Sequence, residues 1–289
     1  MTETTARAPR RVSFSLLERG DPADATGYRA HLERVGFFTD TSVCIGCKAC
    51  EVACKEWNGV PDDGFRLTGM SFDNTGGLSG NTWRHVAFVE THAPAADAGD
   101  GELRWLMASD VCKHCTHAAC LDVCPTGALI RTEFGTVVVQ DDVCNGCGYC
   151  VPACPFGVIG RREHDGRAFK CTLCYDRLRA GMLPACAQTC PTDSIQFGPL
   201  DDLRMRAERR LRELQDAGVS SARLYGEDPE DGIGGAGAFF LLLDEPEVYG
   251  LPPDPVVTTR DLPCLWAHAA VAAAGLVATA LTCFFGRRR

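Results

Sequence analysis

Cysteine spacing is the feature that most constrains this chain. Sixteen of its eighteen cysteines fall into four groups of four, and three of the groups end in Cys-Pro. The groups are Cys44, Cys47, Cys50 and Cys54; Cys112, Cys115, Cys120 and Cys124; Cys144, Cys147, Cys150 and Cys154; and Cys171, Cys174, Cys186 and Cys190. Four thiolates hold one 4Fe–4S cluster, and the run C-x2-C-x2-C-x3-C is the spacing of bacterial ferredoxins. We therefore expect four 4Fe–4S clusters, with iron bound by all sixteen cysteines, and a role in conducting electrons.

Two other uses of cysteine fit this spacing less well. In a secreted disulfide scaffold the cysteines must pair, and neighbours in a CxxCxxC loop are too close to pair well. A structural zinc site usually takes two CxxC pairs separated by a dozen or more residues. A membrane-tethered zinc or redox-sensing module is the alternative from another functional class.

Composition and motifs argue against several other functions. The chain is mildly acidic, with Asp+Glu 38 against Lys+Arg 29, so we expect no nucleic-acid partner. Gly232, Gly234 and Gly237 match GxGxxG, but a strand-like AFFLLL follows them where a nucleotide site needs a helix. There is no nucleophile–base constellation. We expect no bound nucleotide and no catalytic residues, hence a non-catalytic subunit.

An uncharged segment near the C-terminus predicts a membrane anchor. From Cys264 to Gly286 there is no Lys, Arg, Asp or Glu. As a helix these residues would reach about 34 Å, enough to cross a bilayer. Arg287, Arg288 and Arg289 follow at once. The positive-inside rule then predicts a single-pass protein of the cell membrane, with a cytoplasmic C-terminus and the cluster region on the outer face.

Side chains of this segment predict a membrane partner. Ala270, Ala274 and Ala278 recur every four residues, a pattern that favours close helix–helix packing. His268 is an ionisable side chain inside the span, where such groups usually face protein or water. It could contact a partner's haem or quinone region, or donate a packing hydrogen bond to a partner helix.

The fold class that we expect is α+β, with two ferredoxin-like two-cluster modules and one C-terminal transmembrane helix. Residues 1–38 contain Arg10-Arg11 without a following apolar segment, so they predict a solvated arm and not a signal peptide. Residues 39–199 form the four-cluster region, with an inner module at about 110–160 and an outer module from 39–60 and 165–199. Residues 200–259 form a helix, a strand and a partner-docking linker. Residues 260–289 form the anchor with its basic tail.

Local patterns predict several elements within these regions. Residues 82–90 and 102–108 are rich in strand formers, and hairpin turns are expected at Gly135 and at Asp165-Gly166. Residues 200–217 predict an amphipathic helix, capped by Asp201 or Asp202 and ended by Gly218. Residues 239–243 predict a buried strand, and the Pro-rich linker 251–257 is expected to lie across a partner.

The repeat of four cysteine groups predicts how they share clusters. In two-cluster ferredoxins the fourth cysteine of a run binds the other cluster. Applied here, the rule nests the inner pair of groups inside the outer pair. The predicted ligands are Cys44, Cys47, Cys50 and Cys190 for cluster 1; Cys171, Cys174, Cys186 and Cys54 for cluster 2; Cys112, Cys115, Cys120 and Cys154 for cluster 3; and Cys144, Cys147, Cys150 and Cys124 for cluster 4.

All four lysines of the chain adjoin the cysteine groups. They are Lys48, Lys55, Lys113 and Lys170. Either these cations offset the charge of anionic clusters and tune their potentials, or they are solvated loop residues.

Longer stretches around the cysteines resemble a known family. CIGCKACEVACKEWN, CKHCTHAACLDVCPTGAL, CNGCGYCVPACPFGV and KCTLCYDRLRAGMLPACAQTCPT resemble the four-cluster iron–sulfur subunits of molybdopterin oxidoreductases. Within that group, SFDNTGGLSGNTW, LYGEDPEDGIGGAGAFFLLLDEPEVYGLPPDP and the single anchor resemble the beta subunit of membrane-bound respiratory formate dehydrogenase, from Thr39 to the end.

This resemblance implies the partners and the direction of electron flow. A catalytic subunit with a molybdenum or tungsten pterin would oxidise formate, and electrons would pass through the four clusters to a membrane cytochrome b subunit and then to quinone. Nitrate reductase relatives often replace one cluster cysteine with Trp, whereas all sixteen are present here. The alternative is the same role in a membrane hydrogenase or another molybdopterin reductase complex.

Overall fold

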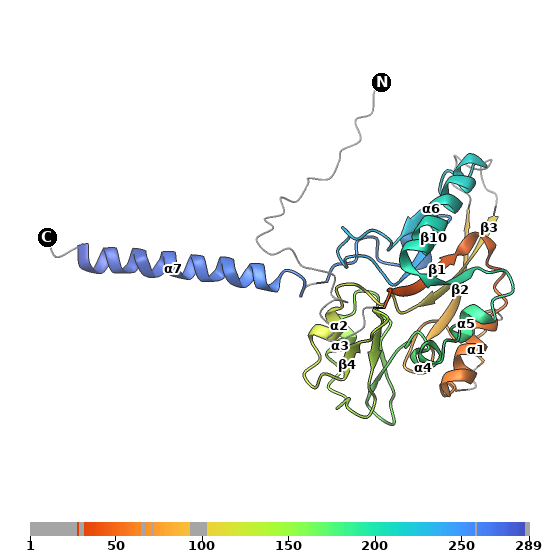
Figure 1. Ribbon diagram of the computed structural model, residues 1–289, viewed down its shortest axis with the longest axis horizontal. Helices are drawn as coiled ribbons and strands as arrows, with labels where there is room; N and C mark the ends of the chain where they lie inside the picture. Colours follow the sequence, from red (N-terminus) through yellow and green to blue (C-terminus); the bar gives the residue numbers. More distant parts are fainter. Residues whose placement is uncertain are drawn as a thin grey trace, which may run out of the picture.

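The computed structural model describes residues 28, 32–64, 67–70, 72–92, 103–257 and 259–286. Arg10-Arg11 and the basic tail Arg287–Arg289 lie outside the described residues. Short helices and strands are mixed in one folded body, and a long C-terminal helix extends away from it (Figure 1). This mixture confirms the expected α+β class.

A four-stranded sheet in the order β8-β1-β10-β9 joins distant parts of the chain. β1 (Val35–Asp40) lies parallel to β10 (Ala238–Leu242) and antiparallel to β8 (Ile195–Pro199), while β9 (Arg223–Tyr225) lies antiparallel to β10. β1 and β10 are short apolar runs, which suit strands covered on both faces. Phe37 packs into the core that holds most of the cysteines, and Phe38 stacks on Phe239 on the other face.

The first strand corrects the boundary of the expected N-terminal arm. Residues 35–38 were predicted to belong to a solvated arm, but they form most of β1, and Phe37 and Phe38 are buried. The strand has only six residues, and the strands that pair with it, β8 and β10, lie far along the chain. Local polarity therefore gave no indication that this segment enters a sheet.

The two predicted strands and the two predicted hairpin turns are confirmed. β2 (Arg84–His92) pairs with β3 (Leu103–Val111) in antiparallel register from one end to the other. β4 (Leu129–Arg131) pairs with β5 (Val137–Val139), and β6 (Gly160–Arg161) pairs with β7 (Ala168–Phe169). Their turns contain Gly135 at φ +74° and Gly166 at φ +75°, a left-handed conformation that glycine adopts without a Cβ penalty.

Within the described ranges, six short helices lie next to the cysteine groups, and four of them contain at least one cysteine. They are the 3-10 helix η2 (Thr41–Val43), α1 (Ala49–Asn58), α2 (Ala119–Asp122), α3 (Cys150–Ala153), α4 (Tyr175–Arg179) and α5 (Ala185–Gln188). In Figure 1, α1, α4 and α5 lie together at the end of the body far from the C-terminal helix, whereas α2, α3 and β4 lie near that helix. The cysteine groups are thereby distributed along the body.

The predicted helix over 200–217 is confirmed as α6 (Leu200–Asp216), which covers one face of the sheet with Leu203 and Ala207. The expected cap is wrong. Pro199 occupies the N-cap position without a side-chain hydrogen bond, and Asp201 and Asp202 lie inside the first turn. There their charges interact favourably with the helix dipole instead.

The Pro-rich linker packs in part on the chain itself, and its expected position across a partner stays a prediction. Leu251, Pro255 and Val257 are buried. The Val257 amide donates to the Gly232 carbonyl at 3.1 Å, and the Tyr225 hydroxyl donates to the Pro252 carbonyl at 2.6 Å. A 3-10 helix, η3 (Pro246–Tyr249), leads into it. The linker therefore fastens the start of the C-terminal helix to the folded body.

The C-terminal helix α7 (Leu262–Gly286) has the properties of a membrane span. Its stretch Cys264–Phe285 has 22 residues, a mean hydropathy of 1.8 and no burial against the rest of the chain. Among the described residues it is the one helix long and apolar enough to cross a bilayer. A helix that is apolar all round and unpacked requires either lipid or protein around it.

Candidate iron–sulfur sites

Three cysteines of the first group meet the last cysteine of the fourth group. Cys44, Cys47, Cys50 and Cys190 line one pocket. Gly46 at φ +65° and Lys48 at φ +57° wrap the loop around this pocket, and Val86 and Ile195 contribute apolar walls. The pocket thus offers four soft sulfur ligands in mostly apolar surroundings. We call these four cysteines thiol set 1.

Thiol set 2 combines Cys54 with three cysteines of the fourth group, namely Cys171, Cys174 and Cys186. Burial raises the pKa of the Cys54 thiol to about 12, and the neighbouring thiols of Cys186 and Cys174 act in the same direction. The Asn58 amide nitrogen lies 3.8 Å from the Cys54 sulfur and 4.0 Å from the Cys174 sulfur. The Leu173 amide donates to the Cys171 sulfur at 3.2 Å.

The two inner groups exchange their last cysteines in the same way. Thiol set 3 consists of Cys112, Cys115, Cys120 and Cys154, and thiol set 4 consists of Cys144, Cys147, Cys150 and Cys124. Burial raises the pKa of the Cys115 thiol, and the other three thiols of set 3 raise it further. Burial raises the pKa of the Cys150 thiol to about 11, and the other three thiols of set 4 add to the rise. Each set therefore consists of thiols close enough to influence one another.

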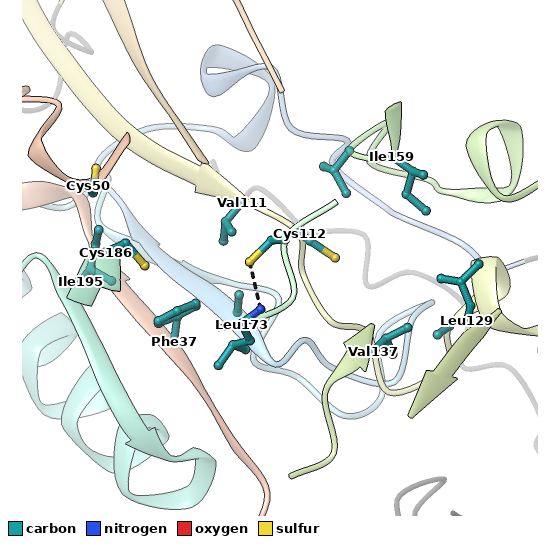
Figure 2. Close-up of a cluster of buried hydrophobic side chains, with 14 of the residues drawn as sticks. Phe37, Cys50, Val111, Cys112, Leu129, Val137, Ile159, Leu173, Cys186 and Ile195 are labelled. Carbon is teal, nitrogen blue, oxygen red and sulfur yellow. Dashed lines mark hydrogen bonds between the residues drawn. The ribbon is translucent and has the colours of Figure 1, made fainter. Parts of the chain in front are cut away.

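The four sets follow one another in a row. Cys50 of set 1 influences the thiols of Cys54 and Cys186 in set 2. Cys112 of set 3 raises the pKa of Cys171 in set 2, and Cys150 of set 4 raises that of Cys120 in set 3. Figure 2 shows Cys50 and Cys186 on one side of the buried core, and Cys112 farther along it.

A zinc ion and a 4Fe–4S cluster need different arrangements of their ligands. Among the described residues, no three Cys, His, Asp or Glu side chains converge closely enough to hold one metal ion. A zinc ion needs all its ligands within about 2.3 Å of one point. In a 4Fe–4S cubane each thiolate binds a different iron, so the ligands stand farther apart.

Two of the four lysines that adjoin the cysteine groups are fully buried. Lys113 and Lys170 are each 1% exposed. Lys113 pairs with Asp110 and lies 4.9 Å from the centre of the Phe240 ring. Solvation therefore explains neither of these two lysines. Lys48 and Lys55 are partly exposed, and they pair with Asp73 at 2.9 Å and Asp63 at 3.0 Å.

Lys170 lies between two thiol sets. Burial alone would lower its pKa, but the thiols of Cys112, Cys120 and Cys171 outweigh burial and raise it. Its ammonium donates to the carbonyl oxygens of Val137 and Cys171. Lys170 thus remains charged beside sets 2 and 3.

A buried arginine was missed by the sequence analysis. Arg84 begins β2 and is 1% exposed. Burial alone would lower its pKa, but four thiols raise it. These thiols belong to Cys186, Cys50, Cys171 and Cys54. Its Nε and Nη2 atoms have no hydrogen-bond partner among the described residues. A buried cation with unpartnered N–H groups beside thiols suits an anionic metal cluster.

The glycine motif serves close packing around set 3. The carbonyl of Gly235 accepts from the Thr116 amide at 3.0 Å, and the carbonyl of Ile233 accepts from the His117 amide at 2.8 Å. A Cβ on Gly234, at φ +73°, would lie 2.4 Å from the His117 ring. The glycines therefore let this loop lie directly against the second cysteine group.

His268 is exposed on α7, with its Nδ1 atom 3.6 Å from the sulfur of Cys264 one turn earlier. Its contact with a haem or quinone region, or with a partner helix, stays a prediction.

Four thiol sets in a row, held on short helices and hairpins, define the class of multi-cluster iron–sulfur proteins. Comparison with known families agrees, because the 4Fe–4S dicluster domain matches residues 43–128 and again 103–200. This chain is a member of the family of formate dehydrogenase iron–sulfur subunits. It is an electron-transfer protein with four 4Fe–4S clusters, which confirms the predicted cofactors.

Two relatives illustrate this membership, and a third is a subunit of a reductase. The nitrate-inducible formate dehydrogenase iron-sulfur subunit of Escherichia coli (strain K12) is 40% identical over 264 residues, covering 89% of this chain and 85% of the relative. The formate dehydrogenase iron-sulfur subunit of Haemophilus influenzae is 41% identical over 234 residues, covering 79% and 72%. The B subunit of the anaerobic dimethyl sulfoxide reductase of Escherichia coli (strain K12) is 38% identical over 175 residues, covering 59% and 76%.

Proposed function

We propose that this chain is the conducting subunit of a membrane formate dehydrogenase complex. A molybdopterin catalytic subunit, with molybdenum or tungsten, oxidises formate and delivers electrons to the clusters. A membrane cytochrome b subunit receives them and reduces quinone. The observation that carries the proposal is the row of four thiol sets. Its inner end includes α2, which is hydrogen-bonded to Thr259 just before the apolar helix α7. The names of the relatives support formate as the electron source.

The four thiol sets are the proposed ligands of the four clusters. Set 1 holds cluster 1, and sets 2, 3 and 4 hold the clusters of the same numbers. The inner module at about 110–160 carries clusters 3 and 4, and the outer module, from 39–60 and 165–199, carries clusters 1 and 2. Support comes from the mutual influence of the thiols within each set and from the shared pocket of set 1.

Electrons enter at cluster 1 and leave at cluster 4 in this proposal. Cys47 of set 1 is exposed, and α1 lies at the end of the body far from α7 (Figure 1). The opposite end bears α2, whose Asp122 accepts a hydrogen bond from Thr259 at the root of α7. The catalytic subunit therefore docks over set 1, and the cytochrome subunit lies beside α7.

The proposed orientation places the cluster region on the outer face of the cell membrane and the C-terminus in the cytoplasm. It rests on the sequence Arg287–Arg289 after the apolar segment. The folded subunit would cross the membrane on a signal carried by its catalytic partner. Protease added to intact cells should then digest the cluster region, whereas a cytoplasmic cluster region would be protected.

The first experiment follows electrons from formate into the clusters. The native complex is purified anaerobically in mild detergent, formate is added, and low-temperature EPR spectra are recorded. Reduced 4Fe–4S signals on the timescale of turnover are expected. If the clusters are reduced by dithionite but not by formate, the chain would have the same role in a membrane hydrogenase or another molybdopterin reductase. A colourless protein without inorganic sulfide would point to a zinc module.

A further inference from the structure

Arg84 is a buried charge without a carboxylate to balance it. Its side chain is 1% exposed, and no acidic group among the described residues forms an ion pair with it. The guanidinium carbon lies 4.8 Å from the centre of the Phe37 ring. Nη1 donates to the carbonyl of Ser109 at 3.3 Å and to its hydroxyl at 3.0 Å. An isolated buried charge is costly, so its balancing charge must come from another source nearby.

The surroundings of Arg84 connect it to two thiol sets. The Ser109 hydroxyl that accepts from Arg84 also lies 3.3 Å from the sulfur of Cys50, in set 1. The other thiols that act on the guanidinium are those of Cys54, Cys171 and Cys186, all in set 2. Its Nε and Nη2 atoms have no partner in the described part of the chain, although both are buried. The guanidinium therefore lies at the junction of the two sets.

We propose that Arg84 is a shared counter-charge for clusters 1 and 2 and a determinant of both reduction potentials. The inference rests on the proposed ligand sets. Each one-electron reduction adds a negative charge to a cluster, and a fixed cation in a poorly screened interior favours the reduced form. Arginine stays charged in proteins and offers several N–H groups in a fork. One side chain thereby raises the reduction potentials of the two neighbouring clusters together. The two potentials stay close to each other at the first step of the electron path.

The test is a redox titration of the assembled complex, followed by EPR with chemical mediators. Because mediators and dithionite supply the electrons, the result does not depend on formate being the donor. Signals are assigned to clusters 1 and 2 by their loss in Cys50→Ser and Cys186→Ser. In Arg84→Gln, the midpoint potentials of both clusters should fall, while those of clusters 3 and 4 stay within error. Arg212→Gln, at an exposed position on α6, is the matched control and should move none of the four.

Arg84→Lys is the second variant, because it keeps the charge and should assemble even where the glutamine variant loses clusters. Iron content is measured for every variant. The lysine variant should keep both potentials close to those of the unaltered complex. Unchanged potentials in an Arg84→Gln complex that retains four clusters would overturn the proposal. A fall in Arg84→Lys equal to that in Arg84→Gln would also overturn it, because charge would then not be the cause.

Discussion

Thr259 donates a hydrogen bond to the carboxylate of Asp122, with 2.6 Å between the two oxygen atoms. Asp122 belongs to α2, between Cys120 of set 3 and Cys124 of set 4, and Thr259 precedes α7 by three residues. Arg260 makes a second connection, because its guanidinium donates to the Asp231 carbonyl. The apolar helix α7 is therefore attached to the body beside the inner pair of thiol sets.

Removal of residues 262–289 should release the chain from membranes without removing its clusters. The apolar stretch of α7 buries no surface against the folded body, so its loss leaves the cysteine loops intact. Membrane fractionation and iron content of the truncated chain check this prediction. A truncated chain with fewer than four clusters would show that α7 supports the body as well as anchoring it.

Cys190→Ser should abolish or alter cluster 1 and leave cluster 2 in place. Cys190 belongs to the fourth cysteine group, but it lines the pocket of Cys44, Cys47 and Cys50. EPR and iron content of the variant distinguish the two outcomes. Cys264→Ser is the control, since that thiol lies in α7 away from the sets, and it should retain all clusters. Loss of the cluster of Cys171 and Cys174 would contradict the nested pairing.

Gly36→Ala should destabilise the protein, whereas Gly198→Ala should be close to neutral. The two glycines are register partners in β1 and β8. A Cβ on Gly36 would lie 2.0 Å from the carbonyl oxygen of Gly237, but a Cβ on Gly198 would meet nothing within 4 Å. Overpacking against backbone typically costs about 1–3 kcal/mol. Thermal unfolding of both variants measures the difference in stability. Equal stabilities would show that β1 shifts to accommodate the added Cβ at little cost.

Lys170→Met should lower stability and also the potentials of clusters 2 and 3. The methionine leaves the carbonyls of Val137 and Cys171 without their donor, at about 1–3 kcal/mol each. The thiols of two sets also lose a cation. Lys55→Met is the control, because its ammonium also donates to two carbonyls, those of Pro61 and Asn81, but is partly exposed, so that water can replace these bonds. Its partly exposed ion pair with Asp63 contributes at most about 1 kcal/mol. Unfolding temperatures and EPR titrations of the two variants decide whether the buried lysine differs from the exposed one.

Cluster loading should depend on pH more strongly in set 3 than in set 4. Burial raises the pKa of Cys120 to about 12 and raises that of Cys115 as well, so both thiols of set 3 are neutral near pH 7. Iron binds the thiolate, hence loading releases their protons and becomes more favourable as pH rises. The pKa of Cys154, also in set 3, is raised by burial as well. In set 4, burial raises the pKa of Cys150 to about 11. Slight burial would also raise the pKa of Cys124, but hydrogen bonds from the amides of Leu129 and Thr126 and from the Thr126 hydroxyl lower it, so fewer thiols with a raised pKa are found in set 4.

The measurement is anaerobic reconstitution of iron-free protein with ferrous iron and sulfide at about pH 7 and about pH 9. The EPR intensity of cluster 3 should rise with pH relative to that of cluster 4. A constant ratio between the two signals would contradict the role assigned to the buried thiols.

The cofactor could be predicted from sequence because ligand chemistry is local. Three cysteines of each set lie within a short segment, and the spacing alone restricts what they can bind. The hairpins at Gly135 and Gly166 were predictable for the same reason, since a left-handed turn requires particular residues. The apolar segment that forms α7 was predictable for the same reason, because its residues are continuous in the sequence.

Features that depend on distant parts of the chain could not be predicted. Val35–Asp40 is a strand only because β8 and β10 lie beside it. Arg84 stands in a strand-like sequence, and nothing there shows that the folded chain buries it among thiols. Strand alternation does place Arg84 on the same face as the buried Val86, a weak signal that a charge belongs to the interior.

The position of β1 between β8 and β10 has a consequence for the maturation of the protein. β1 is synthesised before both of its neighbours and pairs with them only when residues 195–242 have been made, so a large part of the fold closes late. Until then Phe37 and Phe38 expose aromatic surface of the kind that chaperones and proteases bind. The completed sheet buries that surface. Burial of the two aromatic side chains therefore distinguishes a subunit that is ready for assembly.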